Sequence, residues 1–330
     1  MMTTGKSLFF ILLLIILAGS CSSTQSSKQE MQENDNNTMQ TITFSGDSAY
    51  DFVKTQCDFG PRVPNTDAHR LCGDFLIGKL KEYGANVIVQ APVLTAYDGT
   101  KLNARNIIGE FSPEKKRRIL LLAHWDCRPW ADSDPNPANH KKPVMGANDG
   151  ASGVGVLLEM ARLFHAQQPE IGVDILFVDA EDWGDNSGTS TDSDNTWALG
   201  TQYWTANPHR PGYRPIYAIL LDMVGAAGSK FSREYFSMQY APAMVKEVWD
   251  AAERSGYGSY FVKRDGGAIT DDHVFINKAG IPAIDIIAMD LNSPNGFFPQ
   301  WHTVDDTMKH IDKATLKAVG QTLTNLIYSY

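Results

Sequence analysis

The run Arg118-Ile119-Leu120-Leu121-Leu122-Ala123, which ends at His124, decides the fold class of this 330-residue chain. It has the length of a strand and is apolar on both faces, as expected for a central strand of a parallel sheet covered by helices. Three further runs of this kind occupy residues 173–178, 218–221 and 282–288. Amphipathic helical patterns alternate with them at residues 67–83, 153–167, 243–254 and 312–328. The order of these elements predicts one α/β domain spanning residues 41–330.

The first forty residues have the composition of a targeting segment and a linker. Lys6 precedes the apolar run 8–17, which is too short to span a bilayer, and small residues follow it, so residues 1–20 are predicted to be a secretory signal. Cys21 comes directly after these small residues, as in a bacterial lipoprotein signal, although plain cleavage with an incidental cysteine is the alternative. Residues 21–40 are polar and predict a flexible tether. We therefore expect an exported lipoprotein, lipidated at Cys21, anchored to a membrane and facing the periplasm of a Gram-negative bacterium.

Composition excludes several classes of protein. Hydrophobic residues make up 43% of the chain and charged residues 20%, which fits a globular protein with a sizeable core. The formal charge of -9 argues against nucleic-acid binding, because phosphates must be neutralised by Lys and Arg.

Export permits a disulfide between Cys57 and Cys72, whose redox state the sequence leaves open. Cys127 is interpreted as a buried bystander thiol rather than a nucleophile.

Polar residues follow the predicted strands at the edge where open α/β sheets bind ligands. The first three runs end at His124, at the pair Glu181-Asp182 and at Asp222. Asp149 lies in a Gly-rich turn before a predicted helix, and His302 lies near the C-terminus. Each residue alone has an ordinary explanation, such as a helix cap or a surface imidazole. Together they offer the carboxylate and imidazole ligands that zinc accepts.

The order of these motifs resembles that of the zinc aminopeptidase-like superfamily. The motifs are AHWD at 123–126, GANDGASG at 146–153, DAED at 179–182, LLDMVG at 220–225 and WHTVDD at 301–306. Two further stretches, FGPRVP at 59–64 and GGAITDDHVF at 266–275, are similar to those of bacterial glutaminyl cyclases (glutaminyl-peptide cyclotransferases). The resemblance covers nearly the whole chain after the tether. It implies a mixed, mostly parallel central sheet flanked by helices, the zinc exopeptidase or phosphorylase/hydrolase-like fold.

The resemblance also implies roles for individual residues. Zinc would be bound by Asp149, Asp182 and His302, with Glu181 as the general acid/base, held by hydrogen bonds around Asp222 and Asp271. Asp182 departs from the usual pattern, in which most relatives have Glu. Its shorter side chain requires a slightly different backbone position to reach the metal.

The number of zinc ions stays open at this point. Full use of His124 and Asp222 would create a second site bridged by Asp149, as in the aminopeptidases, whereas the cyclases work with one zinc. We favour one zinc per chain. The same ambiguity leaves a di-zinc aminopeptidase as the alternative function, while a non-enzymatic binding module is disfavoured because every candidate ligand and Glu181 is present.

The predicted reaction is cyclisation of an N-terminal glutamine to pyroglutamate, with release of ammonia. The α-amine of the substrate attacks its own γ-carboxamide, so proximity lowers much of the entropic barrier. Peptides or proteins with an N-terminal Gln are therefore the expected partners. Trp183 and Trp301 flank proposed ligands and are predicted, with Ile269, to wall a small pocket for the glutaminyl side chain.

Overall fold

The computed structural model describes residues 42–330 apart from residues 189, 291 and 294, and its described part packs as one unit, Ile42–Tyr330. The predicted signal, the tether and Cys21 lie outside the described residues. Among the described helices, none is long and apolar enough to cross a membrane.

The elements alternate along the chain much as the apolar patterns predict. The strands are β1 (Asn86–Gln90), β2 (Val93–Thr95), β3 (Lys101–Asn103), β4 (Asn106–Phe111), β5 (Arg118–His124), β6 (Gly172–Val178), β7 (Ala218–Asp222), β8 (Phe231–Arg233), β9 (Phe261–Asp265) and β10 (Ala283–Ile287). The α-helices are α1 (Gly46–Asp58), α2 (Asp67–Glu82), α3 (Ala151–Ala166), α4 (Leu199–Ala206), α5 (Tyr235–Tyr240), α6 (Pro242–Arg254), α7 (Asp272–Lys278) and α8 (Lys313–Ile327). Short 3-10 turns are η1 (Pro137–Asn139), η2 (Ser193–Thr196) and η3 (Met308–His310).

A six-stranded sheet with the order β1-β4-β6-β5-β7-β10 forms the centre of the domain. The strands β6, β5, β7 and β10 are parallel, whereas β1 and β4 join that block as antiparallel partners. This confirms the mixed, mostly parallel sheet. Two small ribbons, β2–β3 and β8–β9, lie outside it.

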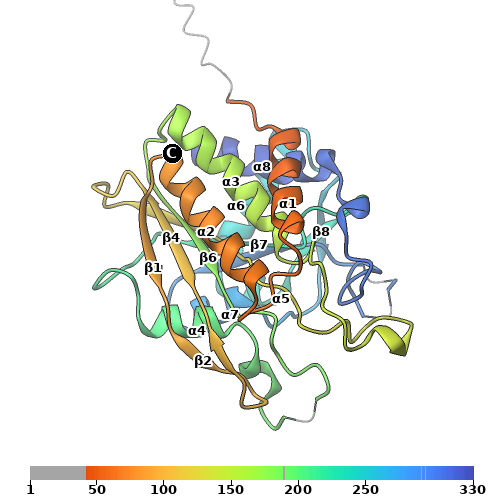
Figure 1. Cartoon of the computed structure of the whole chain (residues 1–330). Helices are drawn as coiled ribbons and strands as arrows, with labels where there is room; N and C mark the ends of the chain where they lie inside the picture. Colours follow the sequence, from red (N-terminus) through yellow and green to blue (C-terminus); the bar gives the residue numbers. More distant parts are fainter. Residues whose placement is uncertain (1–41, 189, 291, 294) are drawn as a thin grey trace, which may run out of the picture. The chain divides into compact units, whose positions relative to one another are not determined.

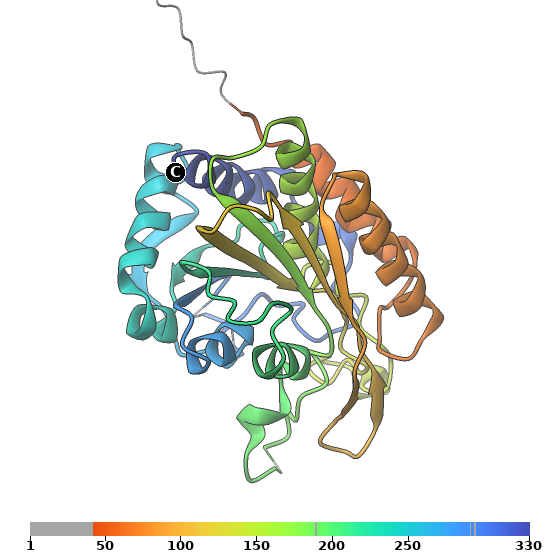
Figure 2. The ribbon, with the colours of Figure 1, turned by 90° about the vertical axis from the view of Figure 1, so that its left-hand side faces the viewer.

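Helices cover both faces of the sheet (Figures 1 and 2). Alternate residues of β5 divide between two cores: Ile119 and Leu121 pack with α1, α3 and α8, while Leu120 and Leu122 pack with Trp204 of α4 and Ile276 of α7. A strand that is buried on both faces must be apolar at every position, which explains the continuous run that identified it.

The four parallel strands bring their carboxyl ends to one edge of the sheet. The polar segments after β5, β6 and β7, together with the turn before α3, meet at this edge. This is where the sequence places the site.

The three described cysteines are free and buried. Burial raises the pKa of the Cys57 thiol to about 11 and that of the Cys72 thiol to about 12. Burial also raises the pKa of Cys127, whose thiol donates a hydrogen bond to the carbonyl of Met145 at 3.3 Å. Thiolates are therefore scarce at neutral pH, in keeping with a bystander role.

Candidate active site

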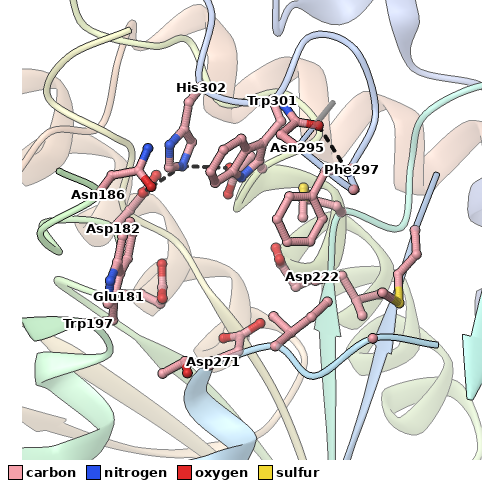
Figure 3. Close-up of a pocket in the computed structure, with 18 of the residues that line it drawn as sticks. Glu181, Asp182, Asn186, Trp197, Asp222, Asp271, Asn295, Phe297, Trp301 and His302 are labelled. Carbon is pink, nitrogen blue, oxygen red and sulfur yellow. Dashed lines mark hydrogen bonds and ion pairs between the residues drawn. The ribbon is translucent and has the colours of Figure 1, made fainter. Parts of the chain in front are cut away.

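Asp149, Asp182 and His302 converge from three distant segments into one cluster. Their candidate ligand atoms all lie within 4.8 Å of one another, and the three side chains are buried. His302 Nε2 is 3.2 Å from Asp182 Oδ1 and 3.6 Å from Asp149 Oδ2. The structure thus brings these three residues together, and Figure 3 shows two of them, Asp182 and His302, side by side.

The donors of this cluster fit a divalent cation. Asp182 Oδ1 is buried and makes no hydrogen bond, although His302 Nε2 lies beside it. Burial and the neighbouring Asp149 raise the pKa of Asp182 to about 6, because two carboxylates are held together out of water. A cation bound by two carboxylates and an imidazole relieves this repulsion, and this donor set suits zinc. Asp149, Asp182 and His302 are therefore the residues that would hold the metal.

A second cluster shares Asp149. His124 Nε2 lies 3.1 Å from Asp149 Oδ1 and forms a 3.2 Å hydrogen bond with Asp222 Oδ1. The candidate ligand atoms of these three residues also lie within 4.8 Å of one another. Asp149 thus presents one oxygen to each histidine, as a bridging carboxylate would. The His124–Asp222 contact has the same length as the 3.2 Å contact between His302 Nε2 and Asp182 Oδ1.

Buried carboxylates brace the turns that carry these ligands. The two oxygens of Asp126 accept hydrogen bonds from the backbone N–H groups of Glu181 and Asp182, each at 3.1 Å. Asp306 does the same for Asn148 and Asp149, at 2.9 and 3.0 Å. Each pair of bonds fixes two consecutive peptide groups, so the following side chain has a defined direction.

Two residues in these segments adopt a backbone conformation that L-amino acids rarely occupy. Ala180, just before Glu181, has φ 53°, and His302 has φ 54°. Such positions cost about 1–3 kcal/mol each and persist only where the surroundings fix them. Gly150 has φ 91°, and a Cβ there would lie 2.7 Å from the carbonyl oxygen of Asp126. Local strain is therefore concentrated at the ligand-bearing turns.

Glu181, Asp222 and Asp271 point into one pocket beside the metal cluster (Figure 3). Burial raises the pKa of Glu181 well above its usual range, and the nearby Asp271 and Asp182 add to the shift. Burial, with Asp222 and Asp272, likewise raises the pKa of Asp271. A carboxyl with a raised pKa can both accept and return a proton near neutral pH. This is the property that the sequence assigned to Glu181.

Aromatic and aliphatic side chains wall the pocket, whose volume is about 410 Å³. Trp301 stacks on the His302 imidazole, with ring centroids 3.7 Å apart and planes at 18°. Phe297 also lines the pocket and packs against the Trp301 ring. Ile269 lines the pocket, as predicted. The pocket is small and largely apolar beside its carboxylates.

Trp183 does not line this pocket, contrary to the sequence expectation. Its ring packs edge-on against Trp130, and its indole N–H donates to Asp98 Oδ2 at 3.3 Å. The backbone after Asp182 turns the side chain away from the metal cluster, so adjacency in sequence did not give proximity to the ligand. Trp197, beyond the polar insertion at 184–196, supplies the aromatic wall instead.

Trp197 is fixed by close packing at the base of the insertion. A Cβ on Gly184 would lie 2.0 Å from the Trp197 ring, so only glycine fits there. The backbone N–H groups of Ala198 and Leu199 donate to the carbonyls of Glu181 and Ala180 at 3.0 and 3.1 Å. The two ends of the insertion are thereby held together.

Arg128 and Asp132 support the site and have no distinctive signature in the sequence. The Arg128 guanidinium donates to the carbonyls of Asp182 and Gly184 at 3.0 and 2.9 Å and to Asp132 Oδ2 at 2.6 Å. It also lies 4.8 Å from the centroid of the Trp197 ring. Asp132 Oδ1 lies 3.3 Å from His302 Nδ1, the nitrogen that would face away from the metal. A carboxylate in that position orients a ligating imidazole.

Comparisons with known proteins give the family and the fold relatives of this chain. The chain matches Peptidase family M28 over residues 106–327. It is 55% identical to the Bacteroides thetaiotaomicron glutaminyl cyclase bound to N-acetylhistamine, with a TM-score of 0.85 over 87% of this chain and 99% of that one. It is 52% identical to a Zn-dependent exopeptidase from Parabacteroides distasonis, with a TM-score of 0.85 over 87% and 99% of the two chains. The glutaminyl-peptide cyclotransferase of Bos taurus is 25% identical over 251 residues, which cover 68% of this chain and just under two thirds (66%) of that protein.

Proposed function

We propose that the chain, which belongs to Peptidase family M28, is a zinc-dependent glutaminyl-peptide cyclotransferase. The observation that carries the proposal is the pocket that joins the Asp149–Asp182–His302 cluster to Glu181, Asp222 and Asp271. The similarity to a bacterial glutaminyl cyclase over nearly all of that chain supports it. The substrates are peptides or proteins with an N-terminal glutamine.

The reaction needs no water. The α-amine nitrogen attacks the γ-carboxamide carbon, the new C–N bond closes a five-membered ring, and the original C–N bond breaks to release ammonia. Zinc, when bound, supplies a Lewis acid that polarises the γ-carbonyl and stabilises the negative charge that develops on its oxygen.

Glu181 moves the proton. It takes a proton from the attacking α-amine and returns it to the departing nitrogen, so the carboxylate is regenerated in each cycle. Asp222 and Asp271 line the same pocket, and Asp271 helps to keep the pKa of Glu181 high. The walls formed by Trp197, Trp301 and Ile269 exclude water and hold the side chain of glutamine so that its two reacting ends meet.

We propose one zinc ion per chain, held by Asp149, Asp182 and His302. The similarity to the Bacteroides thetaiotaomicron glutaminyl cyclase supports this assignment, because cyclisation requires one Lewis acid and no hydroxide nucleophile. The alternative is a di-zinc aminopeptidase, favoured by the way Asp149 faces both His124 and His302.

Product analysis separates the two functions. A purified chain without its first forty residues, loaded with zinc, is incubated with a peptide that begins with Gln and a control peptide that begins with Leu. Cyclase activity converts only the Gln peptide, with loss of one ammonia and no residue, as measured by mass spectrometry. A released free amino acid from either peptide identifies an aminopeptidase and contradicts the proposal.

We also propose that the protein is an exported lipoprotein. The signal-like residues 1–20 and Cys21 support export and lipid anchoring to a membrane, with the catalytic domain in the periplasm. Metabolic labelling with a radioactive fatty acid tests it: the intact chain should take up the label, and a Cys21→Ser variant should not.

A further inference from the structure

A group of basic side chains lies at the edge of the sheet opposite the pocket. Lys115, Lys116, Arg117 and Arg214 form this group, which is called the basic edge patch here. The first three precede β5 and Arg214 precedes β7, so all four lie at the amino ends of parallel strands. In a chain with a formal charge of -9, such a group is unusual.

The two loops that carry the basic edge patch are joined to each other. The N–H of Ile216 donates to the carbonyl of Arg118 at 2.8 Å, and Arg210 Nη1 donates to the carbonyl of Pro113 at 3.2 Å. Lys115, Lys116 and Arg214 line one surface pocket of about 370 Å³. These three charges therefore belong to one surface, and Arg117 is the exposed neighbour of Lys116 in the chain.

These charges are not neutralised within the described part of the chain. Lys116, Arg117 and Arg214 are exposed, and no carboxylate of a described residue lies within ion-pair distance of them. The neighbouring Arg118 and Arg210, by contrast, are paired with Asp174 and Glu110. Glu114 and Glu170 are exposed acids in adjoining segments, so the patch keeps an excess of positive charge.

The patch faces away from the pocket. The pocket residues follow the carboxyl ends of β6, β7 and β10, and the patch precedes the amino ends of β5 and β7. The seven residues of β5 separate the two edges by about 23 Å at 3.3 Å per residue. A surface bound at the patch would leave the pocket open to solvent.

The described chain begins on the same side as the patch. The carbonyl of Ile42 accepts a hydrogen bond from Gln321 in α8 at 2.9 Å. The helix α8 ends at Ile327, and the hydroxyl of Tyr330, three residues further on, accepts a hydrogen bond from that of Tyr217 at 2.6 Å. Tyr217 immediately precedes β7, and Tyr330 interacts electrostatically with Arg117. Figure 1 shows the red start of the described chain and the C-terminus at the same end of the body. The described chain therefore begins beside α8, the helix whose C-terminal end leads to Tyr330 and the patch.

We propose that the basic edge patch docks on anionic lipid headgroups, so that the active site of the anchored protein faces away from the membrane. Charge complementarity favours an anionic bilayer, and Ile216, 40% exposed between the two loops, adds an apolar contact. The predicted tether of about twenty residues has a root-mean-square reach of about 25 Å, which keeps the patch near the bilayer. This inference is independent of the reaction catalysed.

Vesicle sedimentation tests the proposal. The chain starting at Ser22 has no lipid, and its body should fold alone because 99% of the Bacteroides thetaiotaomicron cyclase chain is matched by it. The probe is phosphatidylcholine vesicles with and without phosphatidylglycerol, at low and at physiological salt. The chain should bind only the vesicles that contain phosphatidylglycerol, and binding should weaken with salt.

Charge reversal identifies the surface. The triple variant Lys116→Glu, Arg117→Glu, Arg214→Glu should bind at least about tenfold more weakly, since each basic residue near an anionic surface contributes about fivefold. A matched triple, Lys101→Glu, Lys141→Glu, Lys142→Glu, makes the same change in net charge with exposed lysines at the start of β3 and after η1. It should bind as the unmodified chain does.

Several outcomes overturn the proposal. These are equal binding to vesicles without phosphatidylglycerol, unchanged binding by the first triple variant, and an equal loss in the matched triple. Equally tight binding to a short DNA duplex would reassign the patch to polyanions in general. Thermal unfolding midpoints confirm that each variant is folded. A variant in which Lys116, Arg117 and Arg214 are replaced by Gln, rather than by Glu, should show an intermediate loss of vesicle binding.

Discussion

Replacement of Asp126 by Asn tests whether the buried carboxylate organises the acid/base and metal-binding residues together. Asp126 is fully buried, and its two oxygens accept the N–H groups of Glu181 and Asp182, each at 3.1 Å. Asn presents one oxygen and one NH₂ group, so one backbone N–H would face another donor. Two buried donors are then left without acceptors, at about 1–3 kcal/mol each. We expect the free energy of unfolding to fall by about 2–6 kcal/mol.

The measurement is denaturant unfolding of the metal-free protein, followed by tryptophan fluorescence, so that metal affinity does not contribute. Asp305→Asn is the matched control, because the Asp305 side chain is 46% exposed and pairs only with Lys309 and His310 at the surface. That variant should change the free energy by less than about 1 kcal/mol. The zinc-loaded Asp126→Asn enzyme should also lose kcat, because Glu181 and Asp182 share the bracing carboxylate. An Asp126→Asn variant as stable and as active as the parent would refute the reasoning.

Three further predictions concern the acid/base, the pocket wall and the pH dependence of stability. Glu181→Gln should retain zinc, measured by metal analysis, and lose at least about 100-fold in kcat. Asp149→Ala should lose both the metal and turnover. Full activity in Glu181→Gln would contradict the mechanism. Trp197→Ala should lower kcat/KM for a Gln peptide by about tenfold or more, whereas Trp183→Ala should have a much smaller effect, and equal losses would argue against the pocket assignment. Burial raises the pKa of Asp272 to about 7. In the unfolded chain an Asp has a pKa of about 4, so between pH 4 and pH 7 the native state holds one proton that the unfolded state has lost. The free energy of unfolding therefore decreases as the pH rises through this interval, by up to about 1.4 kcal/mol per pH unit. Asp272→Asn should flatten this dependence in denaturant midpoints measured from pH 5 to 7, and an unchanged slope would show that Asp272 is already ionised.

Much of the fold follows from the sequence because its central strands are buried on both faces. The runs at 118–124 and 173–178 correspond to β5 and β6 nearly residue for residue, since burial on both sides demands apolar side chains throughout. The antiparallel edge strand β1 and the helix α1 were not predicted. β1 is only partly buried, and α1 buries a polar Gln56 beside its apolar residues, so neither has a strong pattern.

The candidate ligands were also accessible from the sequence, whereas their supports were not. Asp149, Asp182 and His302 are recognisable because few residue types bind zinc and the motifs occur in a known order. Asp126 and Asp132 act on backbone N–H groups and on the far side of an imidazole, through contacts that no spacing along the chain encodes. Trp183 directly follows a ligand in the sequence, yet it lies outside the pocket, and Trp197, on which Gly184 packs, lines it.

The polar insertion, residues 184–196, is fixed at both ends, which makes it a suitable position for engineering. Its two ends are held by Gly184 against Trp197 and by the hydrogen bonds of Ala198 and Leu199. Asn186 lines the pocket and donates to Asp132 Oδ2 at 3.3 Å, whereas changes at the exposed Asp192 and Asp194 need not reach the catalytic carboxylates. The exposed Asp194 offers an attachment point for a fluorescent dye or an epitope tag that would report events at the pocket without entering it.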